Sequence, residues 1–204
     1  MSNKNEYLDR RVLKSKRALK EALLALMHKK SFKEITITDI VQKADLNRGT
    51  FYKHYTYKED LLNEIIEDIT IDLVASYREP YKNAETFEVS KLTANAIKVF
   101  DHVQKNANFY KLIIHVELLH GFQYKLCEIL KELSIQDFHA PAMEMDSHID
   151  KEIAASYYAY ALFGMLVEWI KGGFKYSSGY MAKQLLIIIN RNTTASIMKP
   201  SIKK

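Results

Sequence analysis

Apolar residues recur at helical spacing along most of the chain, and this periodicity restricts the fold more than any other feature. Between residues 12 and 30, for example, Leu19, Leu23 and Leu26 form one apolar stripe. No segment shows the sustained alternation of apolar and polar residues that marks a half-buried strand. Only six glycines and three prolines occur among the 204 residues, which leaves few positions for tight turns. We therefore expect an all-α fold.

Capping signals divide the first third of this helical pattern into short segments. Thr36 and Asp39 stand three residues apart, the spacing of a capping box, and predict the start of a second helix. Asn47 is a favourable N-cap for a third helix over residues 48–55. Thr56 and Glu59 match a second capping box and predict a fourth helix that ends before Pro80. Further helices are expected over residues 92–103, 109–115, 118–133, 149–171 and 180–191.

Positive charge is concentrated at the N-terminal end of the chain. Residues 1–60 hold 14 Lys and Arg against 8 Asp and Glu, a net charge of +6, whereas the remaining residues hold 16 against 17, a net charge of −1. A compact basic module on a neutral body is typical of a protein with a polyanionic partner. The alternative is an ordinary solvated charged surface, and the charge alone does not decide between them.

The second and third predicted helices have the spacing of a helix-turn-helix motif. Only three residues, 45–47, separate them, Ala44 is small where the helices would cross, and Leu46 would fill the turn. Phe51 and Tyr55 are placed to anchor the third helix inward. This leaves the other side chains of that helix facing outward, where a recognition helix contacts the major groove: Arg48, Gly49, Thr50, Tyr52, Lys53 and His54.

The stretch 44–55, followed by Lys58-Glu-Asp-Leu-Leu62, resembles the signature of the TetR family of bacterial regulators. The resemblance covers roughly residues 10–65, because the turn, the recognition helix and the start of the next helix agree at fixed spacing. The family usually has Gly where this chain has Asp45, a residue that tolerates a left-handed conformation better than most. The stretch 168–174 weakly resembles the C-terminal region of a subgroup typified by a dihydroxyacetone-kinase regulator.

The resemblance implies a division of the chain and a mode of action. It implies a helix-turn-helix DNA-binding domain at residues 1–56 and a helical effector-binding and dimerisation domain at residues 57–204. The protein would bind a palindromic double-stranded DNA operator as a homodimer, and a small-molecule effector would release it. The alternative is a helix-turn-helix protein whose C-terminal domain binds a protein partner.

The resemblance also implies individual DNA-binding roles. Arg48 would pair with two acceptors of a guanine, and Gly49 would let the backbone approach the groove closely. Thr38 would reach a base, and Lys53 would contact either a base or a phosphate. Phosphate contacts are expected from the remaining members of the set: Thr36, Thr50, Tyr52, His54 and Lys58. The alternative roles are structural: a core position for Tyr52, packing for His54, and solvation for the two lysines.

Aromatic residues in the C-terminal part provide candidates for an effector pocket. These candidates are Phe100, Tyr110, Phe122, Tyr157 and Tyr160, because aromatic rings line pockets in helical bundles and phenols add polar contacts. For the helix that carries Tyr157 and Tyr160, a packed dimer interface is the favoured alternative.

Several other classes of protein are disfavoured by the sequence. His115 and His120 are five residues apart, unlike the four-residue spacing of zinc-binding helices. The longest uncharged stretch, 154–167, is shorter than a membrane span, and residues 1–11 lack the apolar core of a signal peptide. Cys127, the single cysteine, is expected to be a buried thiol. We expect a cytoplasmic bacterial protein without a metal, cofactor or enzymatic activity.

Overall fold

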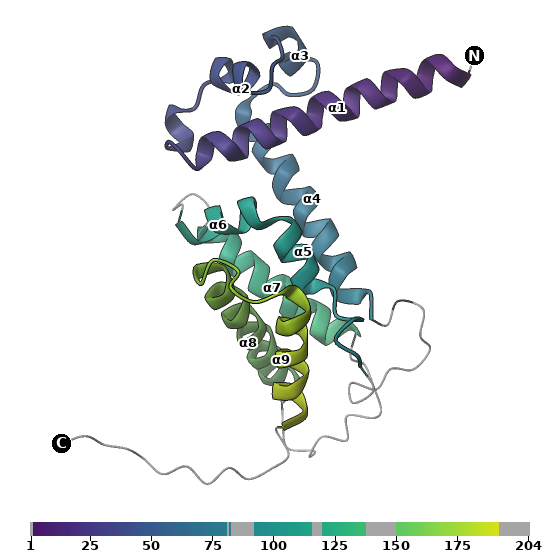
Figure 1. Cartoon of the computed structure of the whole chain (residues 1–204), viewed down its shortest axis with the longest axis vertical. Helices are drawn as coiled ribbons and strands as arrows, with labels where there is room; N and C mark the ends of the chain where they lie inside the picture. Colours follow the sequence, from purple (N-terminus) through teal and green to yellow (C-terminus); the bar gives the residue numbers. More distant parts are fainter. Residues whose placement is uncertain (1, 81, 83–91, 116–119, 138–149, 192–204) are drawn as a thin grey trace, which may run out of the picture.

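A computed structural model of the chain describes residues 2–80, 82, 92–115, 120–137 and 150–191, and over these residues it contains helices and no strand. Figure 1 shows an N-terminal group of helices joined through one long helix to a bundle formed by the rest of the chain. This confirms the expected all-α fold.

The N-terminal group consists of α1 (Ser2–Met27), a short 3-10 helix (Phe32–Glu34), α2 (Ile37–Lys43) and α3 (Arg48–Tyr52). Helix α1 begins ten residues before the expected start. The predicted capping box is present, since Thr36 Oγ1 accepts from the Asp39 amide at 3.1 Å and Asp39 Oδ2 accepts from the Thr36 amide at 2.8 Å. Asn47 Oδ1 caps α3 by accepting from the Thr50 amide at 2.8 Å.

Helix α4 (Lys58–Arg78) connects the N-terminal group to the body. Its capping box differs from the expected one, because Asp60 and not Glu59 supplies the carboxylate. Asp60 Oδ2 accepts from the backbone amides of Thr56 at 3.0 Å and Tyr57 at 2.7 Å. The helix therefore begins one residue later than the pair Thr56 and Glu59 indicated. Pro80 follows the end of the helix, as expected.

The body contains α5 (Val99–Lys105), α6 (Ala107–His115), α7 (His120–Asp137), α8 (Lys151–Lys171) and α9 (Ser178–Arg191). The helix expected over 92–103 is shorter, because residues 92–98 form turns and irregular structure. The stretch around Pro141 lies outside the described residues. Gly172 ends α8, and the following Gly173 has a positive φ of 69°.

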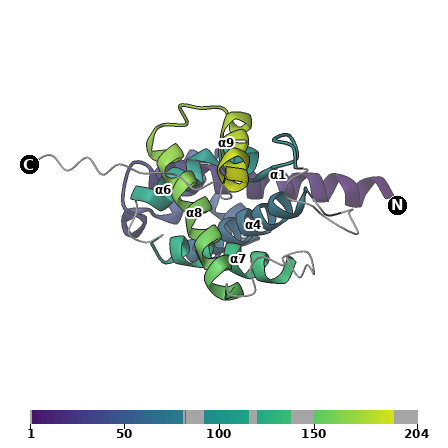
Figure 2. The same cartoon turned by 90° about the horizontal axis from the view of Figure 1, so that it is seen from below.

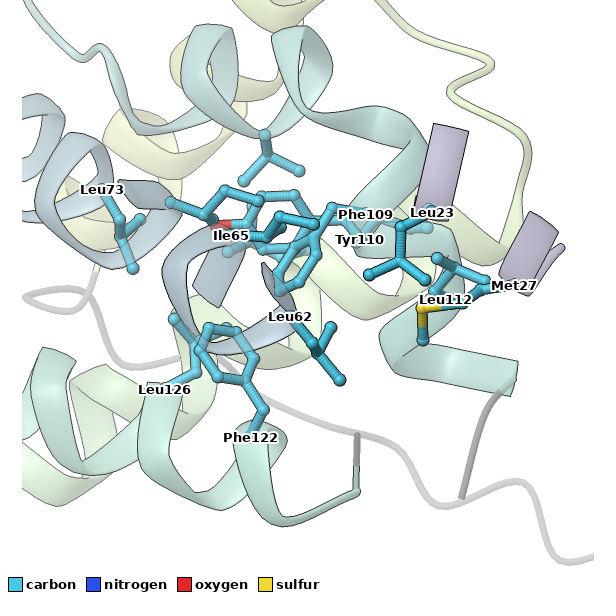
Figure 3. Packing of buried hydrophobic residues seen from close by; sticks show 14 of the residues in the cluster. Leu23, Met27, Leu62, Ile65, Leu73, Phe109, Tyr110, Leu112, Phe122 and Leu126 are labelled. Carbon is cyan, nitrogen blue, oxygen red and sulfur yellow. The ribbon is translucent and has the colours of Figure 1, made fainter. Parts of the chain in front are cut away.

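The N-terminal group and the body share one hydrophobic core. Leu23 and Met27 of α1 lie next to Leu112 of α6, and Leu62 and Ile65 of α4 lie among side chains from both parts (Figure 3). All five side chains are at least nine-tenths buried. Because the cluster is continuous, displacement of the N-terminal group would disturb packing in the body.

A buried polar network also ties α4 to the body. The His102 ring on α5 lies 3.0 Å from Asp72 Oδ2 on α4 through Nδ1 and 2.8 Å from the Tyr110 hydroxyl on α6 through Nε2. Only 3% of His102 is exposed. Burial lowers the pKa of His102, against the opposing effect of Asp72 and together with the repulsion of Lys105. The neutral imidazole therefore links three helices, as buried polar groups require partners.

Helix α8 combines an apolar composition with incomplete burial. By length and composition it would suit a membrane span, the one such helix among the described residues, and 33% of its most apolar stretch is buried inside the structure.

Cys127 on α7 is buried as expected, and burial raises the pKa of its thiol to about 11. Within the described part of the chain, no three His, Cys, Asp or Glu residues are grouped to hold a metal; the side chains of His115 and His120 lie outside that part.

The network predicts that stability falls in mild acid. Because the pKa of folded His102 lies below the unfolded value of about 6.5, the unfolded chain takes up a proton that the folded chain resists. The free energy of unfolding should therefore decrease from pH 7 to pH 5, as measured by urea unfolding. His102→Gln should flatten this slope, whereas His28→Gln, which removes an exposed imidazole, should keep it. Equal slopes in the unaltered protein and His102→Gln would contradict the assignment.

Candidate nucleic-acid interface

The turn between α2 and α3 holds the two helices at a fixed angle. Asp45 has a φ of 55°, which confirms the left-handed conformation expected where the family has Gly. The Leu46 amide donates to the Val41 carbonyl at 2.9 Å and closes the end of α2. Phe51 is fully buried and Tyr55 is 4% exposed, so both anchor α3 inward as predicted. The opposite face of α3 is left to solvent.

Arg48, Tyr52 and Lys53 lie on this exposed face. An Arg48 guanidinium nitrogen donates to the Tyr52 hydroxyl at 3.2 Å, and the guanidinium carbon lies 5.9 Å from the centre of the Tyr52 ring. Tyr52 is 51% exposed, so it is not a core residue. The ring and the guanidinium, one turn apart, thus hold each other at the solvent-facing side of a rigid helix.

Gly49 and Thr50 occupy the first turn of α3 next to its cap. A Cβ at Gly49 would lie 3.3 Å from Asn47 Oδ1, a tight contact with the oxygen that caps the helix. The Thr50 hydroxyl donates to the same Asn47 oxygen at 3.1 Å. Because Gly49 has no side chain, the backbone of this turn stays accessible. The Thr50 hydroxyl supports the cap.

Two exposed threonines lie at the start of α2. The Thr36 hydroxyl donates to Asp39 Oδ2 at 2.7 Å in addition to its capping role, and Thr38 lies two residues further on. Lys30 also donates to Asp39 Oδ2, at 2.9 Å, and holds the pKa of that carboxyl well below its usual range, with further help from Thr36. The start of α2 is thus a tightly hydrogen-bonded corner with Thr38 on its outer side.

His54 and Lys58 are directed inward rather than toward the open face of α3. His54 Nε2 lies 3.1 Å from the Ser15 hydroxyl on α1. Burial, followed by the nearby Lys16 ammonium, lowers the pKa of His54 and favours a neutral ring. The Lys58 ammonium donates to the carbonyls of Phe32 at 2.7 Å, Lys33 at 3.2 Å and Ile35 at 2.8 Å. All three ammonium protons are thereby used inside the protein, where the sequence predicted a phosphate contact.

The five effector-pocket candidates lie in two different settings. Phe100, Tyr110 and Phe122 are at most 6% exposed and belong to the core, whereas Tyr157 and Tyr160 are 63% and 49% exposed on α8. The structure therefore does not bring the two groups together.

An open hollow of about 480 Å³ lies between the end of α8 and the start of α9. Its lining is almost entirely apolar and includes Met165, Trp169 and Met181 but none of the five candidates. Trp169 Nε1 donates to the Tyr176 carbonyl at 2.9 Å, which fixes the loop between the two helices.

Comparison with known proteins identifies the family. Residues 15–65 match the sequence model described as bacterial regulatory proteins, tetR family, and residues 90–191, half of the chain, match the model described as transcriptional regulator C-terminal region. The chain belongs to the TetR family of bacterial transcriptional regulators. It is 27% identical over 193 residues to the Uncharacterized HTH-type transcriptional regulator YxbF of Bacillus subtilis (strain 168), a match that covers 90% of this chain and 46% of that protein. The chain thus spans about half the length of this relative.

Solved structures of TetR-family regulators show the same fold. The dihydroxyacetone kinase operon activator DhaS is 21% identical with a TM-score of 0.58, over 86% of this chain and 95% of DhaS. A TetR transcriptional regulator from Streptococcus agalactiae 2603V is 19% identical with a TM-score of 0.54, over 91% of this chain and 98% of that one. The family is one of DNA-binding regulators, so the exposed face of α3 is its candidate DNA-reading surface.

The sequence did not reveal the residues that hold α1 against α4 and so position the helix-turn-helix of this TetR-family protein. Lys16 and Lys20 on α1 both donate to Glu64 on α4, at 3.1 Å and 2.7 Å, and Lys20 also contacts Asp68 at 2.5 Å. The partners are more than 40 residues apart in sequence, and no local spacing rule connects them. Glu64 and Asp68 are four residues apart and therefore lie on the same face of α4. This shared acidic face was the sequence feature that could have indicated a basic partner helix.

Substitutions of Lys58 and Lys53 should distinguish a lysine with a structural role from one that is only exposed. Lys58→Met keeps the apolar stem but removes three charge-assisted hydrogen bonds, so the free energy of unfolding should fall by about 1–3 kcal/mol. Lys53→Met, on the exposed face of α3, should change it by less than about 0.5 kcal/mol. Urea unfolding followed by circular dichroism measures both. Equal stability of Lys58→Met and the unaltered protein would show that the carbonyl contacts contribute nothing.

Proposed function

We propose that this TetR-family regulator binds a palindromic DNA operator as a homodimer, with α3 of each protomer in the major groove. The observation that carries this proposal is the exposed pair Arg48 and Tyr52, mounted on a short helix that the Asp45 turn and the buried Phe51 hold in place. A guanidinium so placed suits the two acceptors of guanine. The excess positive charge of residues 1–60 suits the phosphates on either side.

The remaining interface residues divide according to their surroundings. Lys53 and Thr38 are exposed, and we assign them contacts with bases or phosphates. Gly49 permits close approach of the backbone, and Thr36 and Thr50 contact phosphates from the capped ends of α2 and α3. His54 and Lys58 belong to the DNA-binding set predicted from the sequence. In this proposal they have supporting roles, because their polar atoms already have partners inside the protein.

The exposed faces of α8 and α9 support the homodimer. On α8, Ile153 is 70% exposed and Tyr157 63%, and Gly164 lies on the same face. A Cβ at Gly164 would meet no atom within 4 Å, so the face is open at that point. On α9, Ile187 and Ile188 are also exposed. The exposed apolar side chains of α8 and α9 are suited to pack against their copies in a four-helix interface.

Release by an effector is the regulatory part of the proposal. Since α4 shares its core with the body, a ligand that opens the packing around Phe100, Tyr110 and Phe122 would move α4 and so the readers. Such a ligand shifts the equilibrium only by its difference in affinity for the two states. Tyr157 and Tyr160 are assigned to the dimer interface instead of the effector site. We propose repression in the cytoplasm, with the effector relieving it.

The DNA-reading role predicts a loss of operator binding with a preserved fold. Arg48→Ala should weaken binding to DNA from the upstream region of the protein's own gene by about tenfold or more, since a good bidentate pair discriminates by about 1–3 kcal/mol. Tyr52→Phe should weaken it less, through loss of the hydroxyl that positions the guanidinium. Fluorescence anisotropy against a scrambled duplex measures both. Lys125→Ala, which removes one exposed charge from α7, is the control, and unchanged binding by Arg48→Ala would refute the assignment.

The dimer interface predicts a monomer that remains folded. Ile188→Lys places a charge in the proposed interface and should shift the protein from dimer to monomer in sedimentation velocity. Its far-ultraviolet circular dichroism should be unchanged, because Ile188 is half exposed in the single chain. Ile71→Lys is the matched control, since Ile71 is 61% exposed on α4 and away from α8 and α9. A dimer that survives Ile188→Lys would place the interface elsewhere.

A further inference from the structure

The hollow between the end of α8 and the start of α9 has no part in the proposed function. Met165, Trp169 and Met181 supply its apolar lining, and Gly164 also lines it. Its volume of about 480 Å³ falls within the range of sites that hold a ring-sized group. Because the lining is apolar, an apolar group that displaces water from the hollow would be stabilised there.

The hollow opens onto the face of α8 that the dimer proposal assigns to the interface. Gly164 lies seven residues after Tyr157, which places both on one side of the helix. Glu168 follows one turn later at the rim of the hollow, and its side chain is 80% exposed. Its carboxylate lies 3.9 Å from the Lys171 ammonium, at the limit of an ion pair, so it remains open to a second cation.

A projecting tyrosine stands beside the hollow. Tyr180 at the start of α9 is 45% exposed, and its ring stacks on that of Tyr176, which lines the hollow, with the ring centres 4.7 Å apart. Lys183 follows Tyr180 by three residues and is also exposed. Each protomer therefore carries an apolar recess with an acid at its rim, next to an exposed ring with a base one turn away. A two-fold interface requires a self-complementary surface of this kind, because the same patch supplies both sides.

Symmetry limits which part of a second copy can reach the hollow. In a homodimer that presents both α3 helices to one DNA duplex, the two-fold axis runs from the DNA into the bodies, and rotation about it keeps every residue at the same height. The end of α8 and the start of α9 both lie at the end of the body nearer to the N-terminal group (Figure 1). Helix α9 runs close to the long axis of the protein, since it is seen almost end-on from below (Figure 2). The start of α9 in a second copy is therefore level with the hollow, whereas Ile188 lies about 12 Å further along that helix.

We propose that the hollow of each protomer receives the Tyr180 ring of the second copy and that Glu168 at its rim pairs with Lys183 of that copy. This inference rests on the proposed homodimer and specifies its register at the end nearer to the DNA. The ring would lie against the thioethers of Met165 and Met181, a favourable contact for an aromatic group. Its hydroxyl would remain at the polar rim. Both contacts occur twice in the dimer, once on each side of the axis.

The ion pair is tested by reversing its charges. Glu168→Lys places a cation opposite Lys183 and should raise the dimer dissociation constant about tenfold or more, and Lys183→Glu should do the same. The variant Glu168→Lys/Lys183→Glu should return the constant to within about threefold of the unaltered value, because every reversed residue then faces a reversed partner. Sedimentation velocity over a range of concentrations measures all three. Lys125→Glu on α7 is the control and should leave the constant unchanged, and a double variant that dissociates as readily as the single ones overturns the proposal.

The place of the ring is tested by filling the hollow. A Cβ at Gly164 would meet no atom within 4 Å, so Gly164→Phe puts a ring into the hollow of the single chain without strain. This variant and Tyr180→Ala should each raise the dissociation constant about tenfold. Combining them should add little to either change alone, because each removes the same contact. Fully additive effects would show that Tyr180 and the hollow do not meet, and would overturn the proposal.

A small apolar ligand is the other candidate occupant, and anilinonaphthalene sulfonate serves as its probe. The variant Ile188→Lys, as a monomer, should bind this dye through its open hollow, whereas the dimer, whose hollows are filled, should bind it weakly or not at all. If monomer and dimer bind the dye equally, and Gly164→Phe abolishes binding while leaving the dissociation constant unchanged, the hollow is a ligand site and the proposal fails.

This proposal and the homodimer on which it rests fail in distinguishable ways. If Ile188→Lys yields a monomer while the Glu168 and Tyr180 variants stay as dimeric as the unaltered protein, the interface stands and this register is wrong. If the unaltered protein is itself a monomer, both proposals fail together. Far-ultraviolet circular dichroism of each variant should match that of the unaltered protein, because the altered residues are exposed in the single chain.

Discussion

The core shared by α1, α4 and α6 is the constraint on which the rest of this structure depends. Leu23 and Met27 reach from the DNA-reading part to Leu112 of the body, and α4 contributes side chains along its whole length. A helix-turn-helix with a separate core of its own would be free to rotate about its connection to the body. Here α3 packs onto a core that continues into the region proposed for the effector, so a change in one would be transmitted to the other through contacts that already exist.

Local signals in the sequence predicted the parts of the fold that local chemistry determines. The capping role of Thr36 with Asp39 and that of Asn47 depend on atoms three residues apart, and both are present. Asp45 was expected in a left-handed conformation because the family that the chain resembles usually has Gly at that position, and its φ is 55°. The inward direction of Phe51 followed from helical spacing. In each case the physical cause acts within one turn of helix.

The sequence could not predict features whose causes lie between distant segments. Lys58 sits at a helix start that suits an anion, but three carbonyls around Phe32 take its ammonium, and only the folded chain brings them together. His54 likewise meets Ser15 across 39 residues. The sequence showed that α8 carries several aromatic rings but not which of them face the core, and Tyr157 is exposed in the structure.

Trp169 is an intrinsic fluorescent reporter of the core and of the loop before α9. Trp169 is the single tryptophan, and its ring packs 5.7 Å from Phe100 in the core and 4.9 Å from Phe174 in the loop before α9. Its indole N–H is bound to the Tyr176 carbonyl, and it lines the hollow between α8 and α9. The emission of this one tryptophan therefore senses rearrangement of both the core and this loop, with no label attached.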